Sequence, residues 1–406
     1  MSAPTPDPTT TRRLRYGMVG GGPGAFIGAV HRRAAALDGL AELVAGAFSS
    51  DAARSRAQGA ELGLDPRRVY ASYEEMAERE AALPDGERID FVAIVTPNHM
   101  HYPNARAFVE RGIHVVCDKP LTTTLEDAEA LCRLVAEHDV VFALTHPYAA
   151  YPLVKQARAL VANGTLGTIR KVIVEYSQGW LATAVEETGN RQADWRTDPA
   201  RAGAGAIGDI GTHAEHLARY VTGLEMERLY ADVSTFVPGR RIDDDANMLV
   251  HYRGGAKGIL FCSQISVGEE NRLALRVYGT EASLEWHQQT PNELLVRRAD
   301  GPLERYTPGH VFLAPEARRG TRMPPGHPEG LLEAFANIYA SVARVIMARR
   351  AGVAPDPLDL DLPTVQDGAA GVHFVHAALE SGRTHAWVDA AYTPPQATPN
   401  AAGADR

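Results

Sequence analysis

Three residues of this 406-residue chain have types and spacings suited to moving a proton: Lys119, Asp209 and His213. Asp209 and His213 stand four residues apart in the motif Gly-Asp-Ile-Gly-Thr-His. On a helix this spacing puts both side chains on one face, where the carboxylate can hold the imidazole in one tautomer. Lys119 directly follows a short apolar run, the position at which an α/β domain places its chemistry. A lysine, a histidine and an orienting carboxylate can together handle the proton when a carbinol is oxidised.

A glycine-rich stretch follows the first apolar run of the chain and precedes a helix-like segment. Glycines at this place allow a tight turn and let backbone N–H groups approach a pyrophosphate at the helix N-terminus. Gly20 and Gly22 have the usual spacing, but Gly28, the third glycine of the pattern, comes six residues after Gly22 instead of three. We interpret residues 23–27 as a lengthened loop, and a part for Gly24 is the alternative. The residues predicted here to bind a dinucleotide are Gly20, Gly22, Gly24, Phe26 and Ile27.

The second apolar run ends without the acidic residue that usually binds the ribose 2′-hydroxyl of NAD. Ser49 and Ser50 stand there instead. Ser49 can hydrogen-bond a ribose hydroxyl, whereas the missing negative charge and the nearby Arg54 would suit the 2′-phosphate of NADP. The sequence therefore leaves NAD and NADP open as cofactors, and it favours NAD because no arginine directly follows Ser49.

The strand-like run before Asp118-Lys119-Pro120, together with the later Gly-Asp-x-Gly-x-His, resembles a known protein family. It is the glucose–fructose oxidoreductase / inositol dehydrogenase / MocA family of nicotinamide-dependent sugar and polyol oxidoreductases. The resemblance extends over residues 14–389, and Asp118 stands where the family more often has glutamate. It implies a Rossmann cofactor domain followed by a second domain that binds the substrate.

The resemblance also implies roles for particular residues. Lys119 would donate a hydrogen bond to the substrate oxygen, His213 would be the general base, and Asp209 would orient His213 or bind a substrate hydroxyl. In relatives, the turn that matches residues 96–99 borders the nicotinamide ribose. The further cofactor contacts predicted in this way are Thr96, Pro97, Asn98, His99, Asp118 and Lys119.

Two stretches with tryptophan could recognise a sugar, because an indole face packs on C–H groups while an amide reads hydroxyls. A Gln-Gly-Trp ends a predicted strand, and an Asp-Trp-Arg precedes the helix of Asp209. A similar Gln-x-Trp in levoglucosan- and glucoside-oxidising relatives favours a pyranose or glycoside. Many relatives carry arginines after the fifth strand, where this chain has Pro-Tyr-Ala-Ala-Tyr, so an acidic substrate is disfavoured. The predicted substrate-binding residues are Lys119, Tyr148, Gln178, Trp180, Trp195, Arg196, Asp209 and His213.

The pattern of apolar runs predicts two domains. From residue 14 to 145 short apolar runs alternate with helix-like segments, which predicts a doubly wound parallel sheet of the Rossmann type. Over residues 146–390, strand-like runs separated by turns predict a mostly antiparallel sheet, with helices against one face and two closing helices late in the chain. The other face should be apolar and mediate a homo-oligomer, a dimer or a tetramer. Residues 1–13 and 391–406 are predicted to be mobile tails.

Composition limits the partners and the compartment. The formal net charge of −9 argues against nucleic acid, and no apolar run approaches the ~18 residues of a membrane span. Three scattered cysteines are too few for a disulfide framework or a zinc site, and no metal is predicted. Arg12-Arg13 superficially resembles a twin-arginine export signal, but the stretch after it should be the first strand and the glycine-rich loop. A cytoplasmic location is therefore predicted.

Three classes of function fit these residues. The first is transfer of a hydride between nicotinamide and a ring hydroxyl or keto group of a sugar, glycoside or cyclic polyol. The second keeps NAD tightly bound and uses transient oxidation to cleave or epimerise a glycoside, which needs the same residues. The third is a non-catalytic, dinucleotide-sensing regulator, against which the intact Lys119, Asp209 and His213 argue.

Overall fold

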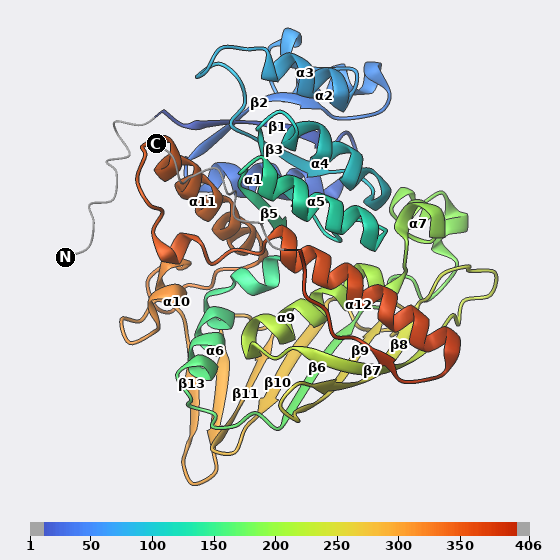
Figure 1. Ribbon diagram of the computed structural model, residues 1–406, viewed down its shortest axis with the longest axis vertical. Coiled ribbons are helices and arrows are strands. Elements are labelled where there is room, and N and C mark those ends of the chain that lie inside the picture. The colour runs from blue at the N-terminus through green and yellow to red at the C-terminus, as the bar shows by residue number, and fades with distance from the viewer. Residues whose placement is uncertain (1–11, 396–406) are drawn as a thin grey trace, which may run out of the picture.

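The computed structural model describes residues 12–395 and contains two sheets (Figure 1). The first is a parallel sheet with the strand order β2-β1-β3-β4-β5. Its central strand β3 is apolar and buried along its whole length because both faces of the sheet are covered. The strands are β1 (Leu14–Gly20), β2 (Ala41–Ala47), β3 (Phe91–Val95), β4 (His114–Asp118) and β5 (Phe142–Thr145). The predicted doubly wound parallel sheet is confirmed.

The first sheet is covered by α1 (Phe26–Leu37), α2 (Ala52–Glu61), α3 (Tyr73–Ala81), α4 (His101–Val109), α5 (Leu125–Glu137), α11 (Leu331–Arg350) and α12 (Val365–Thr384). Polar side chains fix where several of them begin: Asp51, Ser72 and Thr124 accept backbone N–H groups in the first turns of α2, α3 and α5. α1 differs, because Ala25 at its start offers no side-chain cap and its first turn has no acidic residue. The first N–H groups of α1 are thus left for another partner.

Two helices near the end of the chain complete the core of the first sheet. Phe335 and Tyr339 of α11 pack in one cluster with Tyr16 and Phe91 of the sheet. α12 lies against α5 and adds Val372 to the cluster on the opposite face. These helices were expected to close the second domain, and α12 does also pack on the second sheet. The mean hydropathy of 1.4 along α11, high enough for a membrane span, reflects its burial in this core.

The second sheet has nine strands in the order β13-β12-β11-β10-β6-β9-β8-β7-β14. They are β6 (Lys171–Ser177), β7 (Met226–Ser234), β8 (Asp245–Tyr252), β9 (Lys257–Ser263), β10 (Arg272–Tyr278), β11 (Ala282–His287), β12 (Leu294–Arg298), β13 (Leu303–Tyr306) and β14 (Val388–Asp389). All neighbouring strands are antiparallel except β6 and β9. The mostly antiparallel second sheet is therefore as predicted.

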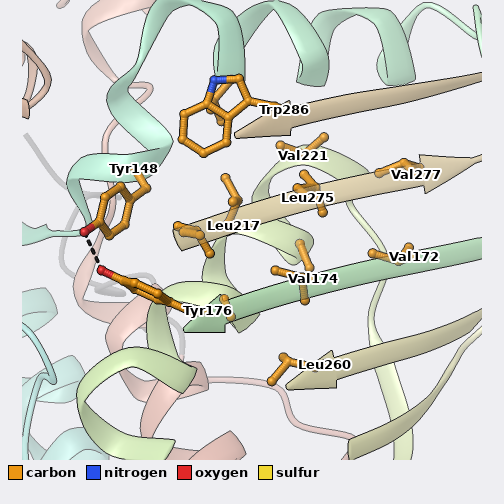
Figure 2. Packing of buried hydrophobic residues seen from close by; sticks show 14 of the residues in the cluster. Tyr148, Val172, Val174, Tyr176, Leu217, Val221, Leu260, Leu275, Val277 and Trp286 are labelled. Atoms are coloured by element: carbon orange, nitrogen blue, oxygen red, sulfur yellow. Dashed lines mark hydrogen bonds between the residues drawn. The ribbon is translucent and has the colours of Figure 1, made fainter. Parts of the chain in front are cut away.

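One face of the second sheet is buried under helices. α6 (Pro152–Ala162) and α9 (Thr212–Thr222) lie on it, and Leu217 and Val221 of α9 face Val174 and Leu275 (Figure 2). The shorter helical segments are η1 (Pro66–Arg68), η2 (Asn98–Met100), η3 (Pro147–Ala150), η4 (Val185–Thr188), α7 (Arg191–Arg196), α8 (Pro199–Ala202), η5 (Ile207–Gly211), α10 (Pro315–Arg319) and η6 (Pro357–Asp359).

The outer face of the second sheet is apolar only in part. A row of paired residues on β7, β8, β9 and β6 consists of Tyr230, Leu249, Ile259 and Ile173. The same row continues on β10 and β11 as Arg276 and Glu285. Ion pairs tie the charged half together, since Glu175 lies within 3.7 Å of arginines on β10. The expectation of an apolar outer face thus holds only for this row, because the next row of the same face on the same strands carries Arg228, His251, Lys257 and Lys171.

The predicted tails, residues 1–13 and 391–406, lie mostly outside the residues that the structure describes. At the inner ends of both segments the chain makes contacts. Arg12 forms an ion pair with Asp90 at 3.0 Å, and Tyr392 stacks on His373 with ring centroids 4.4 Å apart. Both contacts place the limits of the packed chain a few residues beyond the predicted ones.

The shared core predicts that a change in α11 weakens the first sheet. Phe335→Ala should lower the free energy of unfolding by about 3–5 kcal/mol, because it leaves a cavity between α11 and the sheet. Hydrogen exchange should accelerate in β1 and β3, although these strands are some 240 or more residues away in the sequence. Leu360→Ala, at a side chain that is 54 % exposed, is the control and should change stability by less than about 0.5 kcal/mol. Faster exchange confined to the second sheet would contradict the shared core.

Candidate functional site

A cavity of about 720 Å³ opens at the carboxyl ends of β1, β2 and β3 and reaches the helices of the second sheet. It lies where the strand order reverses around β1, the place at which doubly wound sheets bind ligands. Of the predicted residues, those lining it are Gly20, Gly22, Gly24, Ile27, Ser49, Ser50, Arg54, Thr96, Pro97, Asn98, His99, Asp118, Lys119, Trp195, Arg196 and Asp209. The predicted residues outside its lining are Phe26, Tyr148, Gln178, Trp180 and His213.

At Gly22 and Gly28 the packing around the glycine-rich loop leaves no room for a side chain. A Cβ on Gly22 would lie 2.5 Å from the carbonyl oxygen of Phe48, just after β2. A Cβ on Gly28 would lie 2.5 Å from the Cα of Gly21, so α1 packs directly on the loop and Gly28 takes the place of the third glycine. The free N–H groups at the start of α1 point to the same place. These features fit a dinucleotide whose pyrophosphate rests on the loop and on the helix N-terminus.

Phe26 does not join the lining of this cavity. It is the first residue of α1, and its side chain is 69 % exposed. The start of a helix directs its N–H groups toward a ligand, while the side chain of the same residue is free to turn to solvent. The contact of Phe26 with the cofactor therefore stays a prediction.

The end of the cavity beside β2 carries groups of both charges. Asp51 caps α2, with its Oδ1 2.8 Å from the N of Ala53, while Ser49, Ser50 and Arg54 line the cavity. The start of α3 joins them, because Tyr70 N donates to the carbonyl of Gly46 in β2 and brings the following residues alongside. Sequence reasoning missed this segment, which adds Ser72, Tyr73 and Glu74 to the lining. Arg54 and Glu74 therefore line the same end of the cavity, and both NAD and NADP remain possible cofactors.

Lys119 and Asp209 form an ion pair where the two sheets meet. Lys119 directly follows β4, and its Nζ donates to Oδ1 of Asp209 at 2.7 Å and to the Asp209 carbonyl oxygen at 2.5 Å. Gln264 Nε2 donates to the other carboxylate oxygen at 2.8 Å, and Arg196 Nε lies 3.5 Å from it. Burial alone would raise the pKa of the Asp209 carboxyl, but the charges of Lys119 and Arg196 outweigh it and hold the pKa well below its usual value. The carboxylate is therefore ionised.

His213 has a different partner from the predicted one. Its Nδ1 lies 3.3 Å from Nδ1 of His146, and the ring of Tyr148 meets it edge-on with centroids 4.8 Å apart. In the described part of the chain Asp209 makes no hydrogen bond to His213, and its two carboxylate oxygens accept from Lys119 and Gln264 instead. A charge-assisted bond to an ammonium is stronger than one to a neutral imidazole. Asp209 therefore orients Lys119 and not His213.

The surroundings of His213 keep its imidazole neutral. The side chain is 7 % exposed and lies near the ammonium of Lys119. Burial, and after it the positive charge of Lys119, lowers the pKa of His213 well below its ordinary value of about 6.5, while Asp209 opposes this change. With Nδ1 taken by His146, Nε2 is the nitrogen left to exchange a proton. A neutral imidazole of this kind can act as a base near neutral pH.

Tyr148, Gln178 and Trp180 belong to a hydrogen-bonded chain beside His213. The hydroxyl groups of Tyr148 and Tyr176 are 2.6 Å apart (Figure 2), and Tyr176 donates to Oδ1 of Asn271 at 2.6 Å. Gln178 Nε2 donates to the same oxygen at 2.8 Å, and Trp180 Nε1 donates to Gln178 at 3.0 Å. These contacts fix the side chains to one another.

Several residues of the site were missed by sequence reasoning. Gln264 follows β9, and the parallel pairing of β9 with β6 places it at the same sheet edge as Gln178. The alternation of apolar residues would have marked the end of β9, but it does not reveal which strands are parallel. Arg191 and Arg201 also line the cavity, from positions on either side of the Asp-Trp-Arg stretch. Within residues 12–395 no group of three or more His, Cys, Asp or Glu side chains is placed to hold a metal ion.

Comparison with known proteins gives the family. Residues 14–146 match an oxidoreductase family with an NAD-binding Rossmann fold, and residues 154–285 match the GFO/IDH/MocA C-terminal domain. The chain belongs to the GFO/IDH/MocA family. This family assignment agrees with the resemblance seen in the sequence, and it makes the first domain a nicotinamide dinucleotide-binding domain.

Three GFO/IDH/MocA relatives cover nearly the whole chain. An oxidoreductase from Sinorhizobium meliloti has 48 % identity and a TM-score of 0.85, with 93 % of this chain and 100 % of that chain covered. An inositol dehydrogenase homolog from Azotobacter vinelandii complexed with NAD+ has 38 % identity and a TM-score of 0.88, with 93 % and 97 % covered. A levoglucosan dehydrogenase from Pseudarthrobacter phenanthrenivorans has 27 % identity over 93 % of this chain and 98 % of its own length.

The charge of Lys119 should be visible in the titration of His213. Lys119→Met removes a cation near the imidazole, so the pKa of His213 should rise relative to the parent protein. Asp209→Asn removes the opposing anion and should lower it further. The measurement is an NMR titration in which the His213→Gln variant assigns the resonance. A His213 resonance that titrates at the same pH in all three proteins would show that these charges do not act on it.

Proposed function

We propose that this GFO/IDH/MocA oxidoreductase oxidises a ring hydroxyl of a sugar, glycoside or cyclic polyol, or reduces the corresponding keto group. The observation that carries the proposal is the ion pair of Lys119 and Asp209 at the inner end of a cavity that begins at the glycine-rich loop. An ammonium group held there by a carboxylate can bind the oxygen of a carbinol. Bound nicotinamide dinucleotide supplies the acceptor or donor for the hydride at the carbinol carbon.

Each residue has a separate part in the proposed reaction. Lys119 donates a hydrogen bond to the substrate oxygen and stabilises the negative charge that develops as the C–H bond breaks. His213, neutral because of its burial, accepts the hydroxyl proton in oxidation and returns it in reduction. Asp209 holds the side chain of Lys119 in place through the two contacts to its Nζ. In oxidation, the carbonyl of the product forms as the carbon loses its hydride to the nicotinamide and the oxygen loses its proton to His213.

The substrate class is supported by relatives and by the lining of the cavity. An Azotobacter vinelandii homolog of 38 % identity has been solved with NADH and myo-inositol, and a further relative is a levoglucosan dehydrogenase. Trp195 lines the cavity with Arg196 stacked on its ring at 4.2 Å, which presents an aromatic face and hydrogen-bond donors suited to a polyhydroxylated ring. We propose further that the protein acts in the cytoplasm, which its three free, buried cysteines support, and as a homo-oligomer.

Turnover should depend on Lys119 and His213 far more than cofactor binding does. Lys119→Ala and His213→Ala should each lower kcat by roughly 10²–10⁴, because both groups act on charge or protons that move during the reaction. Asp209→Asn should also lower kcat, because Asp209 holds the ammonium of Lys119. The measurement is reduced-cofactor absorbance with pyranoses, glycosides and inositols, with each nucleotide. Lys257→Ala, at an exposed position on β9, is the control. Near-normal kcat in both variants would reject the assignment.

A second candidate is an enzyme that retains its cofactor and oxidises a glycoside transiently before cleavage or epimerisation. It is favoured by the segment around Arg191, which reaches across to within 3.5 Å of the glycine-rich loop and would slow release of a bound dinucleotide. Such a protein should purify with stoichiometric nucleotide and turn over glycoside without free NADH appearing. Stoichiometric release of NADH with product would reject this candidate and leave the first.

A further inference from the structure

A strap, residues 181–203, runs from the second sheet to the cofactor cavity and is anchored at both ends. At its start, Arg240, with a side chain only 1 % exposed, donates to two strap carbonyls and pairs with Glu186 at 2.9 Å. At its end, Nδ2 of Asn98 donates to the carbonyl of Ala202 at 2.9 Å. Because Asn98 belongs to the first domain, the middle of the strap is held over the cavity between the two domains.

Arg191, the first residue of α7, places a guanidinium group at the glycine-rich loop. Its Nη1 lies 3.5 Å from the carbonyl oxygen of Pro23 and 3.9 Å from the position of a Cβ on Gly24. Pro23 and Gly24 connect Gly22 to α1, so the guanidinium stands beside the N–H groups of the loop and of the helix start. Arg191, Pro23 and Gly24 all line the cavity.

Among the described residues, no carboxylate forms an ion pair with Arg191. In the described part of the chain its polar contact is a carbonyl oxygen and not a carboxylate. The other two strap arginines of the cavity are paired, Arg196 with Asp209 at 3.5 Å and Arg201 with Asp194 at 2.7 Å. An unpaired cation, an uncapped helix N-terminus and a turn of exposed N–H groups all attract an anion. A pyrophosphate, with two negative charges, can satisfy all three.

We propose that Arg191 binds the pyrophosphate of the dinucleotide from the side of the second domain. The inference rests on the proposed nicotinamide dependence. The pyrophosphate would then be held between the loop of the first domain and the strap of the second, so that the bound cofactor contacts both domains. Arg54, at the end of the cavity beside β2, lies with Ser49 and Ser50 and would meet the adenosine ribose instead. The two arginines therefore serve different parts of the cofactor.

The test compares dissociation constants of NAD+, NADP+ and ADP-ribose, measured by calorimetry on the full-length protein freed of nucleotide. Arg191→Gln should weaken all three ligands by about tenfold or more, because they share the pyrophosphate. The dissociation constants of Arg191→Lys should lie between those of the parent protein and of Arg191→Gln, because lysine keeps the charge but loses the paired donors. The control is Arg33→Gln, which removes an exposed charge from α1 outside the cavity and should leave binding unchanged. The unfolding temperature without nucleotide should be the same in the parent and in Arg191→Gln.

The outcomes separate this inference from the proposed function. Unchanged constants in Arg191→Gln would overturn the role of Arg191 while leaving the oxidoreductase proposal intact. A loss confined to NADP+ would assign Arg191 to the 2′-phosphate and overturn the pyrophosphate contact. An equal loss of affinity in Arg33→Gln would show that the effect comes from net charge, and it would also overturn the pyrophosphate contact of Arg191. A parent protein that binds none of the three ligands would refute the proposed function, and the role of Arg191 with it.

Discussion

The ion pair between Lys119 and Asp209 joins the end of β4 to a helical turn 90 residues later in the chain. Two charges that are largely withdrawn from water cost several kcal/mol in lost hydration, and they are tolerated only with good geometry and further hydrogen bonds. Here the side chains are 13 % and 20 % exposed, and Gln264 and the Asp209 carbonyl supply the further bonds. The pair therefore requires that the two domains keep one relative position.

The rest of the structure supplies that position. α12 packs on α5 of the first domain and on β7 and α9 of the second, so one rigid helix contacts both. α11 fills the core of the first sheet and also contacts the η3 segment that leads into the second domain. Asn98 adds a hydrogen bond to Ala202 beside the cavity. A site that needs one group from each domain is thus built on elements that belong to both.

Much of the fold and part of the site follow from local patterns. Continuous apolar runs, glycine spacing and the Asp118-Lys119-Pro120 motif predicted the parallel sheet, the loop and the lysine, because each depends on neighbours in sequence. The partner of Asp209 could not be predicted, since a spacing of four residues suggests His213, whereas the stronger bond comes from a distant lysine. The place of Gln264 in the site could not be predicted either, because it depends on the parallel pairing of β6 and β9. The sequence shows that α11 is apolar, but it does not show which of the two sheets α11 covers.

The place of α11 in the first core also affects how the protein is made. One face of the Rossmann sheet, on which α1 packs early, stays only partly covered until residues 331–350 have left the ribosome, although its strands are complete by residue 145. During that interval Tyr16 and Phe91 lack their partners from α11, and exposed apolar surface of this kind promotes aggregation of incomplete chains. We therefore expect the incomplete chain to need protection from aggregation until α11 has packed on the first sheet.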